Sequence, residues 1–279
     1  MPFRIVQSKQ NARLKELRRA LAHPGRDERG LAGIEGPNLL DEALRAGLHI
    51  DCVFAAAPEG EQLLEALQLP PEIEVLLMPR ELLNSALGTE TPQPIAALVE
   101  PPDWTWAHVL GIHKSTAPLI LVLAGLQDPG NLGSILRSAE AFGADGILCL
   151  PGTVSPWNSK AVRASAGSLF RLPLLAATEA EAFARLREAG IKIFATTVRA
   201  GQPANLADLT TPTAILIGNE GNGIPPELAA SVDSALTIPC PGPVESLNAA
   251  VAASVLLYEA SRQRSVQTPG AHAHRKNQA

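Results

Sequence analysis

The chain has 279 residues, of which 46% are hydrophobic and 18% are charged, and its formal net charge is −5. This composition is typical of a globular protein with one or two domains, and the acidic sum argues against nonspecific coating of nucleic acids. No window reaches the roughly 18 uninterrupted apolar residues of a membrane span, and the start lacks a signal-peptide pattern. We therefore expect a cytoplasmic protein that contacts no membrane. Three widely spaced cysteines exclude a disulfide framework and offer no C-x-x-C metal site.

Charge is unevenly distributed, because the first 29 residues hold eight Lys/Arg against three Asp/Glu. In the segment SKQNARLKELRRA, Leu14, Leu17 and Leu21 recur at helical spacing and predict an amphipathic helix. The cationic side chains of this region include Lys9, Arg13 and Lys15. Taken alone, such a surface is more often simply solvated. The functional hypothesis is a surface that contacts nucleic-acid phosphates.

Residues 31–99 alternate between short strands and helices. We predict strands over 31–35, 50–56, 74–78 and 95–99, and helices over 39–46, 61–67 and 80–87. Residues 101–118 interrupt every periodicity and have prolines near both ends, which is typical of a linker. The sequence therefore predicts a small α/β domain over residues 1–100.

The chain resumes the alternation after the linker, with more apolar strands. We predict strands over 119–126, 146–150, 191–196, 214–217 and 235–238, and helices over 131–142, 159–169, 179–189 and 246–262. Apolar strands separated by helices indicate a buried parallel sheet, and such sheets bind ligands at the carboxyl ends of their strands. This pattern predicts a second α/β domain over residues 119–264, followed by a disordered tail over 265–279.

Three loops of the second domain carry unusual residues. In QDPGNLGSILRSAEAFG, Asn131 is predicted to cap a helix that places Arg137 among apolar residues and beside Glu140, a possible ion-pair partner. In IPCPGPVESLNAAVAASVLLYEA, Ser246 is predicted to cap a helix of small side chains that allow a close approach of backbone or ligand. Taken singly, each segment is also explained as an ordinary capped and packed helix.

The third loop, IGNEGNGI, has the order G-x-x-G-x-G with Glu220 at its centre. This order fits neither the dinucleotide fingerprint nor the P-loop, and the carboxylate would repel a pyrophosphate. The loop is predicted to serve another ligand or only a turn.

Together, N-x-G-x-x-x-R (131–137), G-N-E-G-x-G (218–223) and I-P…S-L-N-A-A-V-A (238–252) resemble, in this order, the signature motifs of the SpoU/TrmH family. The family belongs to the SPOUT superfamily and comprises RNA ribose 2′-O-methyltransferases that use S-adenosyl-L-methionine. The resemblance extends to residues 155–174, and to the N-terminal unit through Glu35-Gly36 and Thr91-Pro92-Gln93. It implies a ribosomal-protein-like RNA-binding domain, followed by a SPOUT α/β domain with a parallel sheet and a deep trefoil knot.

The resemblance also implies roles for individual residues. The cofactor would be held by Thr196, Thr197, Gly218, Ile238 and Leu247. The catalytic positions would be Arg137, Asn131, Glu220, Ser246 and Asn248. RNA would be contacted by Lys9, Arg13, Lys15, Lys160 and Arg163, and no metal is implied. Because the pKa of an arginine lies above ~12, we interpret Arg137 as a phosphate-binding and charge-stabilising group, and leave its action as a base open. Glu220 would orient Arg137 or Asn131.

Family members are homodimers whose active site borrows residues from the partner chain, so a homodimer acting on ribosomal or transfer RNA is expected. The alternative is a non-catalytic RNA-binding or ribosome-assembly protein with the same fold. Loss of Arg137, Asn248 or Gly218 would favour it, and all three are present. A nucleotide-dependent enzyme would need a phosphate loop that QDPGNLGS does not supply, and six scattered histidines disfavour a metal hydrolase.

Overall fold

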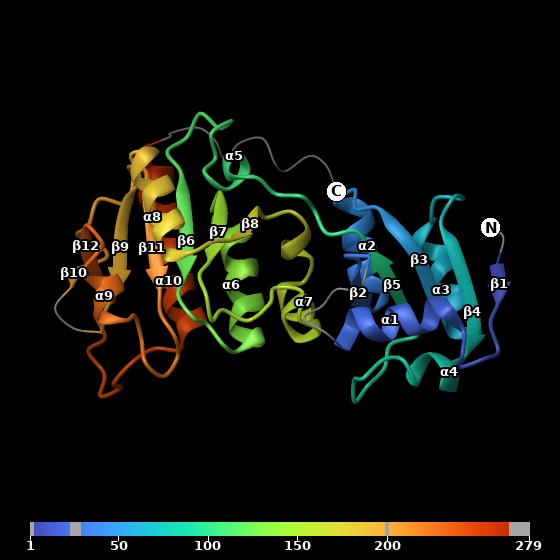
Figure 1. Cartoon of the computed structure of the whole chain (residues 1–279). Coiled ribbons are helices and arrows are strands. Elements are labelled where there is room, and N and C mark those ends of the chain that lie inside the picture. The colour runs from blue at the N-terminus through green and yellow to red at the C-terminus, as the bar shows by residue number, and fades with distance from the viewer. Residues whose placement is uncertain (1–2, 23–28, 199–200, 268–279) are drawn as a thin grey trace. The chain divides into compact units, whose positions relative to one another are not determined.

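The computed structural model describes residues 3–22, 29–198 and 201–267 (Figure 1). The chain forms two compact units, and residue contacts are concentrated within each of them. The first unit combines residues 1–103 with the later segments 132–137 and 154–171, and the second unit contains the remainder. The division after residue 103 falls within the predicted linker.

The first unit is built on a mixed five-stranded sheet with the spatial order β1-β4-β3-β5-β2. Its elements are β1 (Phe3–Ile5), α1 (Ala12–Ala22), β2 (Ala32–Glu35), α2 (Pro37–Arg45), β3 (Ile50–Ala57), α3 (Glu59–Leu67), β4 (Glu74–Pro79), α4 (Arg80–Asn84), β5 (Ile95–Val99), α7 (Ser159–Ser165) and the 3₁₀ helix η1 (Ser168–Phe170). Strand β5 runs antiparallel to both of its neighbours, whereas β1, β3 and β4 run parallel. Leu14 and Leu17 of α1 are fully buried in the core, as their helical spacing predicts.

The second unit is built on an all-parallel seven-stranded sheet with the order β10-β12-β9-β11-β6-β7-β8. Its strands are β6 (Leu119–Leu123), β7 (Gly146–Cys149), β8 (Leu174–Ala176), β9 (Lys192–Thr196), β10 (Gln202–Pro203), β11 (Thr213–Ile217) and β12 (Ser234–Thr237). Its helices are α5 (Trp106–Val109), α8 (Glu179–Glu188), α9 (Pro226–Ala229) and α10 (Ala249–Gln267), and α6 (Pro129–Ala141) is divided between the units. The predicted parallel sheet is confirmed.

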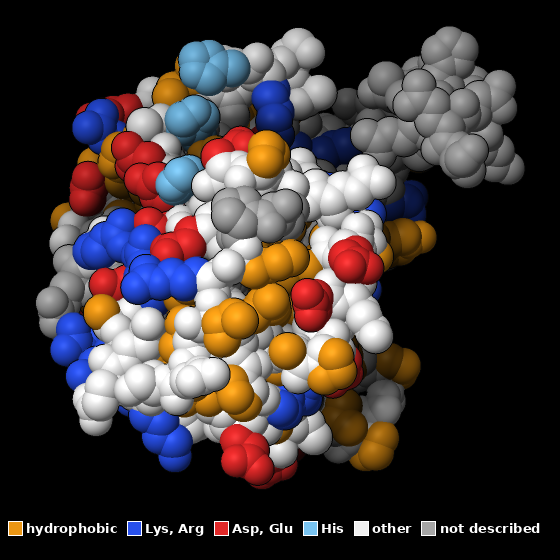
Figure 2. Space-filling view, turned by 90° about the vertical axis from the view of Figure 1, so that its right-hand side faces the viewer, with side chains coloured by type: hydrophobic (Ala, Val, Ile, Leu, Met, Phe, Trp, Pro, Cys, Tyr) orange, Lys and Arg blue, Asp and Glu red, His pale blue; other side chains and the backbone are white. Residues whose placement is uncertain are grey.

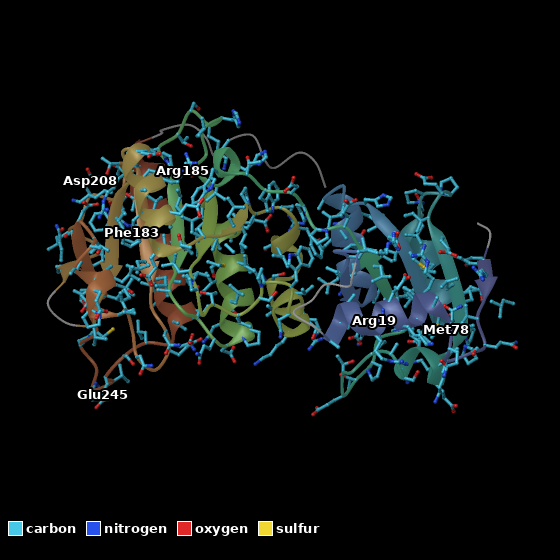
Figure 3. All side chains as sticks on the ribbon, viewed as in Figure 1. Arg19, Met78, Phe183, Arg185, Asp208 and Glu245 are labelled. Carbon is cyan, nitrogen blue, oxygen red and sulfur yellow. The ribbon has the colours of Figure 1, made fainter. Side chains whose placement is uncertain are left out.

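Every residue of the central strands β6, β7 and β11 is buried, so both faces of this sheet are covered. On one face, Ile120, Leu148 and Ile193 pack with Phe183 and Leu186 of α8. Phe183 is buried, whereas its neighbour Arg185 is exposed (Figure 3). Figure 1 shows α10 behind the sheet and α8 in front of it. None of the helices in the described part of the chain could cross a membrane.

Two predicted helix caps are wrong. Helix α6 begins at Pro129, and Asp128 caps it by accepting a hydrogen bond from the Asn131 N–H at 2.8 Å. A proline is favoured at the first helical position, so this start costs no hydrogen bond. Helix α10 begins at Ala249 and is capped by Asn248, not by Ser246, because the Asn248 Oδ1 atom accepts from the N–H groups of the second and third helical residues. Asn131 therefore does not cap α6, and Asn248 takes the capping position predicted for Ser246.

The sequence patterns also missed the short elements β1, β8, β10, α5 and α9, none of which is long enough to show a period. Helix α10 continues to Gln267, three residues into the predicted tail, and residues 268–279 lie outside the described residues.

Arg264 fastens the C-terminal half of α10 to the second unit. Its guanidinium donates to four backbone carbonyls, those of Ala117, Pro118, Leu209 and Thr211. The side chain is half-buried, and this burial lowers the pKa of Arg264 below its usual value. Carbonyl oxygens therefore replace water around this cation.

We expect Arg264→Leu to lower the free energy of unfolding by about 3 kcal/mol, because it removes charged hydrogen bonds and leaves carbonyl groups without a donor. Chemical denaturation followed by circular dichroism measures this loss. Arg262→Ala is the matched control, since Arg262 is exposed and pairs with Glu259 on the helix surface at 2.7 Å. That change is expected to cost less than about 1 kcal/mol. Equal losses in the two variants would contradict the role of the carbonyl contacts.

Candidate active site

A cavity of about 720 Å³ lies at the carboxyl ends of β9, β11 and β12 in the second unit. The last residues of these strands, Thr196, Ile217 and Thr237, line it. The predicted cofactor positions Thr196, Thr197, Gly218, Ile238 and Leu247 are all among the lining residues. The structure therefore brings together five residues that are spread over 52 positions of the sequence.

The loop after β11 closes on itself and leaves no room for a side chain at its first glycine. Asn219 and Gly223 exchange backbone hydrogen bonds of 2.9 and 3.0 Å. A Cβ atom added to Gly218 would lie 2.4 Å from the Gly223 carbonyl carbon. The Asn219 side chain accepts from the Gly221 N–H and donates to the Gly125 carbonyl oxygen at 2.8 Å. These contacts shape the loop and tie it to the loop after β6.

Glu220 lies in this loop and accepts three hydrogen bonds from the region around the start of α6. Its Oε1 atom accepts from the Asp128 N–H at 3.1 Å and from Asn131 Nδ2 at 3.0 Å, and its Oε2 atom accepts from the Gln127 N–H at 3.2 Å. Partial burial alone would raise the pKa of the Glu220 carboxyl, but these hydrogen bonds outweigh burial and lower the pKa below its usual value. Glu220 is therefore ionised at neutral pH.

The same network reaches the third motif. Asn131 Oδ1 accepts from Asn248 Nδ2 at 3.0 Å, and Asn248 Oδ1 caps α10. Because each amide donates on one side and accepts on the other, the orientation of both asparagine side chains is determined by the chain Glu220–Asn131–Asn248. Of the two predicted partners of Glu220, the structure selects Asn131. Asn131 and Asn248 do not line the cavity, whereas Glu220 and Ser246 do.

Arg137 is exposed on α6. Its predicted ion pair with Glu140 is not formed, and no other ion pair of Arg137 is found in the described part of the chain. It is also absent from the described residues that line the cavity. Its guanidinium is available to an anionic ligand.

The predicted RNA contacts fall into two kinds. Arg13 is surrounded by carboxylates, with Asp51 at 2.8 Å, Glu16 at 3.1 Å and Glu74 at 3.2 Å. These carboxylates neutralise the positive charge of the Arg13 guanidinium. The contacts with Asp51 and Glu74 also join α1 to β3 and β4. Lys9, by contrast, is exposed. Figure 2 shows Lys/Arg and Asp/Glu side chains interleaved on the visible face, not a continuous cationic patch.

Two other predicted RNA contacts, Lys160 and Arg163, lie on α7 in the first unit, and Lys15 is half-buried on α1. The Arg163 guanidinium lies 3.9 Å from the carboxylate of Glu35, a buried residue that also accepts from Thr89 and from the Gln93 N–H. Contact of these cations with RNA stays a prediction. Among the described residues there is no group of three or more His, Cys, Asp or Glu side chains that could hold a metal ion.

Several residues of the site were missed. The sequence could not show that the backbone N–H groups of Gln127 and Asp128 donate to Glu220, because any residue other than proline supplies such a group. Asn219 had a local signal, since an asparagine two residues before a glycine commonly closes a turn with its side chain. The loop residues Val244 and Glu245 also line the cavity and carried no signal of their own.

Comparison with known proteins agrees with this geometry. The SpoU rRNA Methylase family model matches residues 118–258, and the model of an MRM3-like substrate binding domain matches residues 11–97. The 23S rRNA (guanosine(2553)-2′-O)-methyltransferase RlmP of Bacillus subtilis is 29% identical over 91% of this chain and 97% of its own length.

Two solved structures have the same fold over nearly the whole chain. The AdoMet-bound rRNA methyltransferase from Sinorhizobium meliloti has a TM-score of 0.80 and 30% identity, and the match covers 93% of this chain and 98% of that one. The SpoU methyltransferase AviRb from Streptomyces viridochromogenes, in complex with the cofactor AdoMet, has a TM-score of 0.79 and 30% identity, covering 92% and 99%. The family model covers about half of the sequence and includes the described residues that line the cavity. The chain therefore belongs to the SpoU rRNA methylase family.

Proposed function

We propose that this protein transfers the methyl group of S-adenosyl-L-methionine to a ribose 2′-hydroxyl of RNA. The observation that carries the proposal is the cavity formed by three strand-end loops and connected through Glu220 to Asn131 and Asn248. Relatives of known structure bind AdoMet, and RlmP acts on a 2′-oxygen of 23S rRNA. The 2′-hydroxyl is the group that distinguishes RNA from DNA.

The cavity fits this cofactor. Its volume of about 720 Å³ lies within the ordinary range for small-molecule sites. Its lining contains glycine, threonine and apolar residues and no lysine or arginine among the described positions, which suits an adenosyl group without phosphate. When bound, the cofactor supplies a methyl group attached to positively charged sulfur. Thr196, Thr197, Gly218, Ile238 and Leu247 would hold it, largely through backbone groups.

The side chains around the cavity would act on the RNA. We propose that Arg137 binds the phosphate next to the target ribose and stabilises negative charge on the 2′-oxygen as its proton is lost. Its exposure and its lack of an ion pair within the described residues support this role. Asn131 and Asn248 would keep Glu220 and the start of α10 in place. Ser246, exposed in the lining, would contact the reacting ribose.

We propose ribosomal RNA as the target, in the cytoplasm, with the domain over residues 1–100 contributing to recognition of the target. The match of residues 11–97 to a substrate-binding domain supports this assignment. Domain boundaries at 101–118 and 264 and the deep trefoil knot remain predictions. Mapping 2′-O-methyl sites in RNA from a strain that lacks this protein would identify the substrate. One lost site is expected, and no lost site in any abundant RNA would favour the non-catalytic alternative.

We further propose that the protein acts as a homodimer through α10. Val251, Val255 and Tyr258 lie on one side of this helix and remain 48%, 39% and 54% exposed. Apolar side chains in such a row commonly mark a protein interface. Because Arg137 does not line the cavity of its own chain, a second copy would supply it. Light scattering of the purified protein should give twice the mass of the chain, and an active monomer would contradict the dimer.

Arg137→Ala tests the catalytic proposal. We expect methyl transfer to RNA to fall at least about 100-fold, because the variant loses a positioned cation that stabilises developing charge. Cofactor affinity measured by calorimetry should stay close to that of the unmodified protein. Arg185→Ala on α8 is the control, since Arg185 is exposed and distant in sequence from every motif. Near-normal turnover of Arg137→Ala would remove Arg137 from the mechanism.

A further inference from the structure

Among the residues that the structure describes, those of the cavity wall carry negative charge only. Among the described residues that line it, the charged side chains are Glu220 and Glu245, and there is no lysine, arginine or histidine. Glu245 is exposed at the tip of the loop between β12 and α10 (Figure 3). Glu220 lies on a different loop, the one after β11, and also lines the cavity. Within the described part of this chain, the lining therefore supplies no cation that would neutralise these carboxylates.

The charge on Glu220 is held in place by neutral groups. Its three hydrogen-bond donors are the backbone N–H groups of Gln127 and Asp128 and the amide of Asn131. Such donors stabilise the ionised form and fix its position, but they leave the net charge of −1 uncompensated. The lowered pKa of Glu220 keeps this charge present at neutral pH. Glu220 and Glu245 are both exposed, so water and salt screen both charges, but the three hydrogen bonds hold the Glu220 charge at a fixed position.

We infer that the cavity distinguishes the methyl-donating cofactor from its demethylated product by charge, with Glu220 supplying most of the discrimination and Glu245 a smaller part. This inference rests on the proposed function, because it takes the cavity as the cofactor site. S-adenosyl-L-methionine carries a positively charged sulfur, whereas the sulfur of S-adenosylhomocysteine is neutral. Their adenosine and amino-acid parts are the same, so those contacts cancel in the comparison. A negatively charged wall attracts the first ligand more than the second and thereby favours release of the product.

Calorimetry with two stable ligands tests the inference without methyl transfer. Sinefungin has a protonated amine where the cofactor has its methylsulfonium, and S-adenosylhomocysteine is the neutral reference. The measured quantity is the ratio of their affinities. In Glu220→Gln this ratio, sinefungin over S-adenosylhomocysteine, is expected to fall about fivefold. In Glu245→Gln it should fall about twofold. Affinity for the neutral ligand should change little in both variants.

Glu227→Gln is the matched control, because Glu227 lies on α9 next to the same loop and does not line the cavity. It should leave the ratio unchanged. For the unmodified protein, the ratio should also fall as the ionic strength rises from roughly 0.01 M to 1 M, since salt screens exposed charges. If shape alone governed which ligand binds more tightly, the affinity ratio would not change with ionic strength.

The outcomes separate the inference from the proposed function. A ratio that is the same in the unmodified protein and both Gln variants overturns the charge-based discrimination while leaving the cofactor site intact. If Glu220→Gln binds neither ligand, the substitution has disrupted the loop, and the decision then rests on Glu245→Gln and on the salt series. The inference is overturned if the affinity ratio in Glu245→Gln equals that of the unmodified protein and the ratio also stays constant with ionic strength. Failure of the unmodified protein to bind either ligand would instead contradict the proposed function.

Discussion

Gly218→Ala is expected to weaken cofactor binding about 10- to 100-fold, which corresponds to roughly 1–3 kcal/mol of steric strain. The added Cβ atom would lie 2.4 Å from the backbone carbonyl carbon of Gly223 and 2.6 Å from its oxygen. A backbone atom cannot rotate away as a flexible side chain can, so the whole loop must shift. That shift moves Glu220 as well. Calorimetric titration with S-adenosylhomocysteine measures the loss.

Gly221→Ala provides the comparison within the same loop. An added Cβ atom there would meet only the side-chain oxygen of Asn219, at an ordinary contact distance of 3.5 Å. We expect its effect on affinity to be much smaller than that of Gly218→Ala, with thermal unfolding close to that of the unmodified protein. Equal losses would mean that any alanine in the loop blocks binding, and would contradict the specific steric role of Gly218.

Asn131→Asp is expected to reduce methyl transfer at neutral pH by about 100-fold or more, because displacements near 1 Å in an active site can have effects of this size. The substitution replaces a donor that lies 3.0 Å from Glu220 with a second carboxylate. Two carboxylates at this distance cannot both ionise without repulsion, so the pair retains one proton and its apparent pKa rises. The repulsion would separate the first and second motifs.

The pH dependence identifies repulsion as the cause. In Asn131→Asp, activity and stability should recover as the pH falls below the raised pKa and should decline as the pH rises through it. The unmodified protein should behave in the opposite sense, since the pKa of Glu220 is lowered. Its contribution to stability is present above the pKa of about 4.3 of an unfolded glutamate and disappears as the pH falls through the lower folded value. Asn131→Ala removes the contact without adding charge, and it should be milder than Asn131→Asp and should not recover in acid. If Asn131→Asp reduced activity less than Asn131→Ala, repulsion between the carboxylates would be excluded as the cause.

The helix caps show where local sequence patterns mislead. Ser246 and Asn131 are both good capping residues, and the patterns around them favoured them. In the folded chain, Asp128 and Asn248 cap the helices instead. The side chain of Asn131 is then free to bridge Glu220 and Asn248. Capping propensity is a property of a few adjacent residues, and it could not indicate which of two suitable residues a distant partner would engage.

The basic N-terminal region gives a second example. A count of charges suggested a cationic surface, but Arg13 contacts Asp51 and Glu74, which are 38 and 61 residues away along the chain. Net charge over a segment does not report the neutralisation that packing brings. Lys9 remains exposed, so only part of the predicted surface is left to contact phosphates.

The sequence by itself determined the order of the longer strands and helices and the family motifs, and the resemblance of those motifs implied five of the residues that line the cavity. These features depend on local chemistry: glycines where the backbone approaches closely, apolar strands, and loops at strand ends. Only the tertiary structure decided which polar groups meet. Asn131 lies 89 residues from Glu220 and 117 residues from Asn248, and their hydrogen bonds exist because parallel strands bring three loops to one edge of the sheet. A polar side chain can bond to many partners, and the fold selects one.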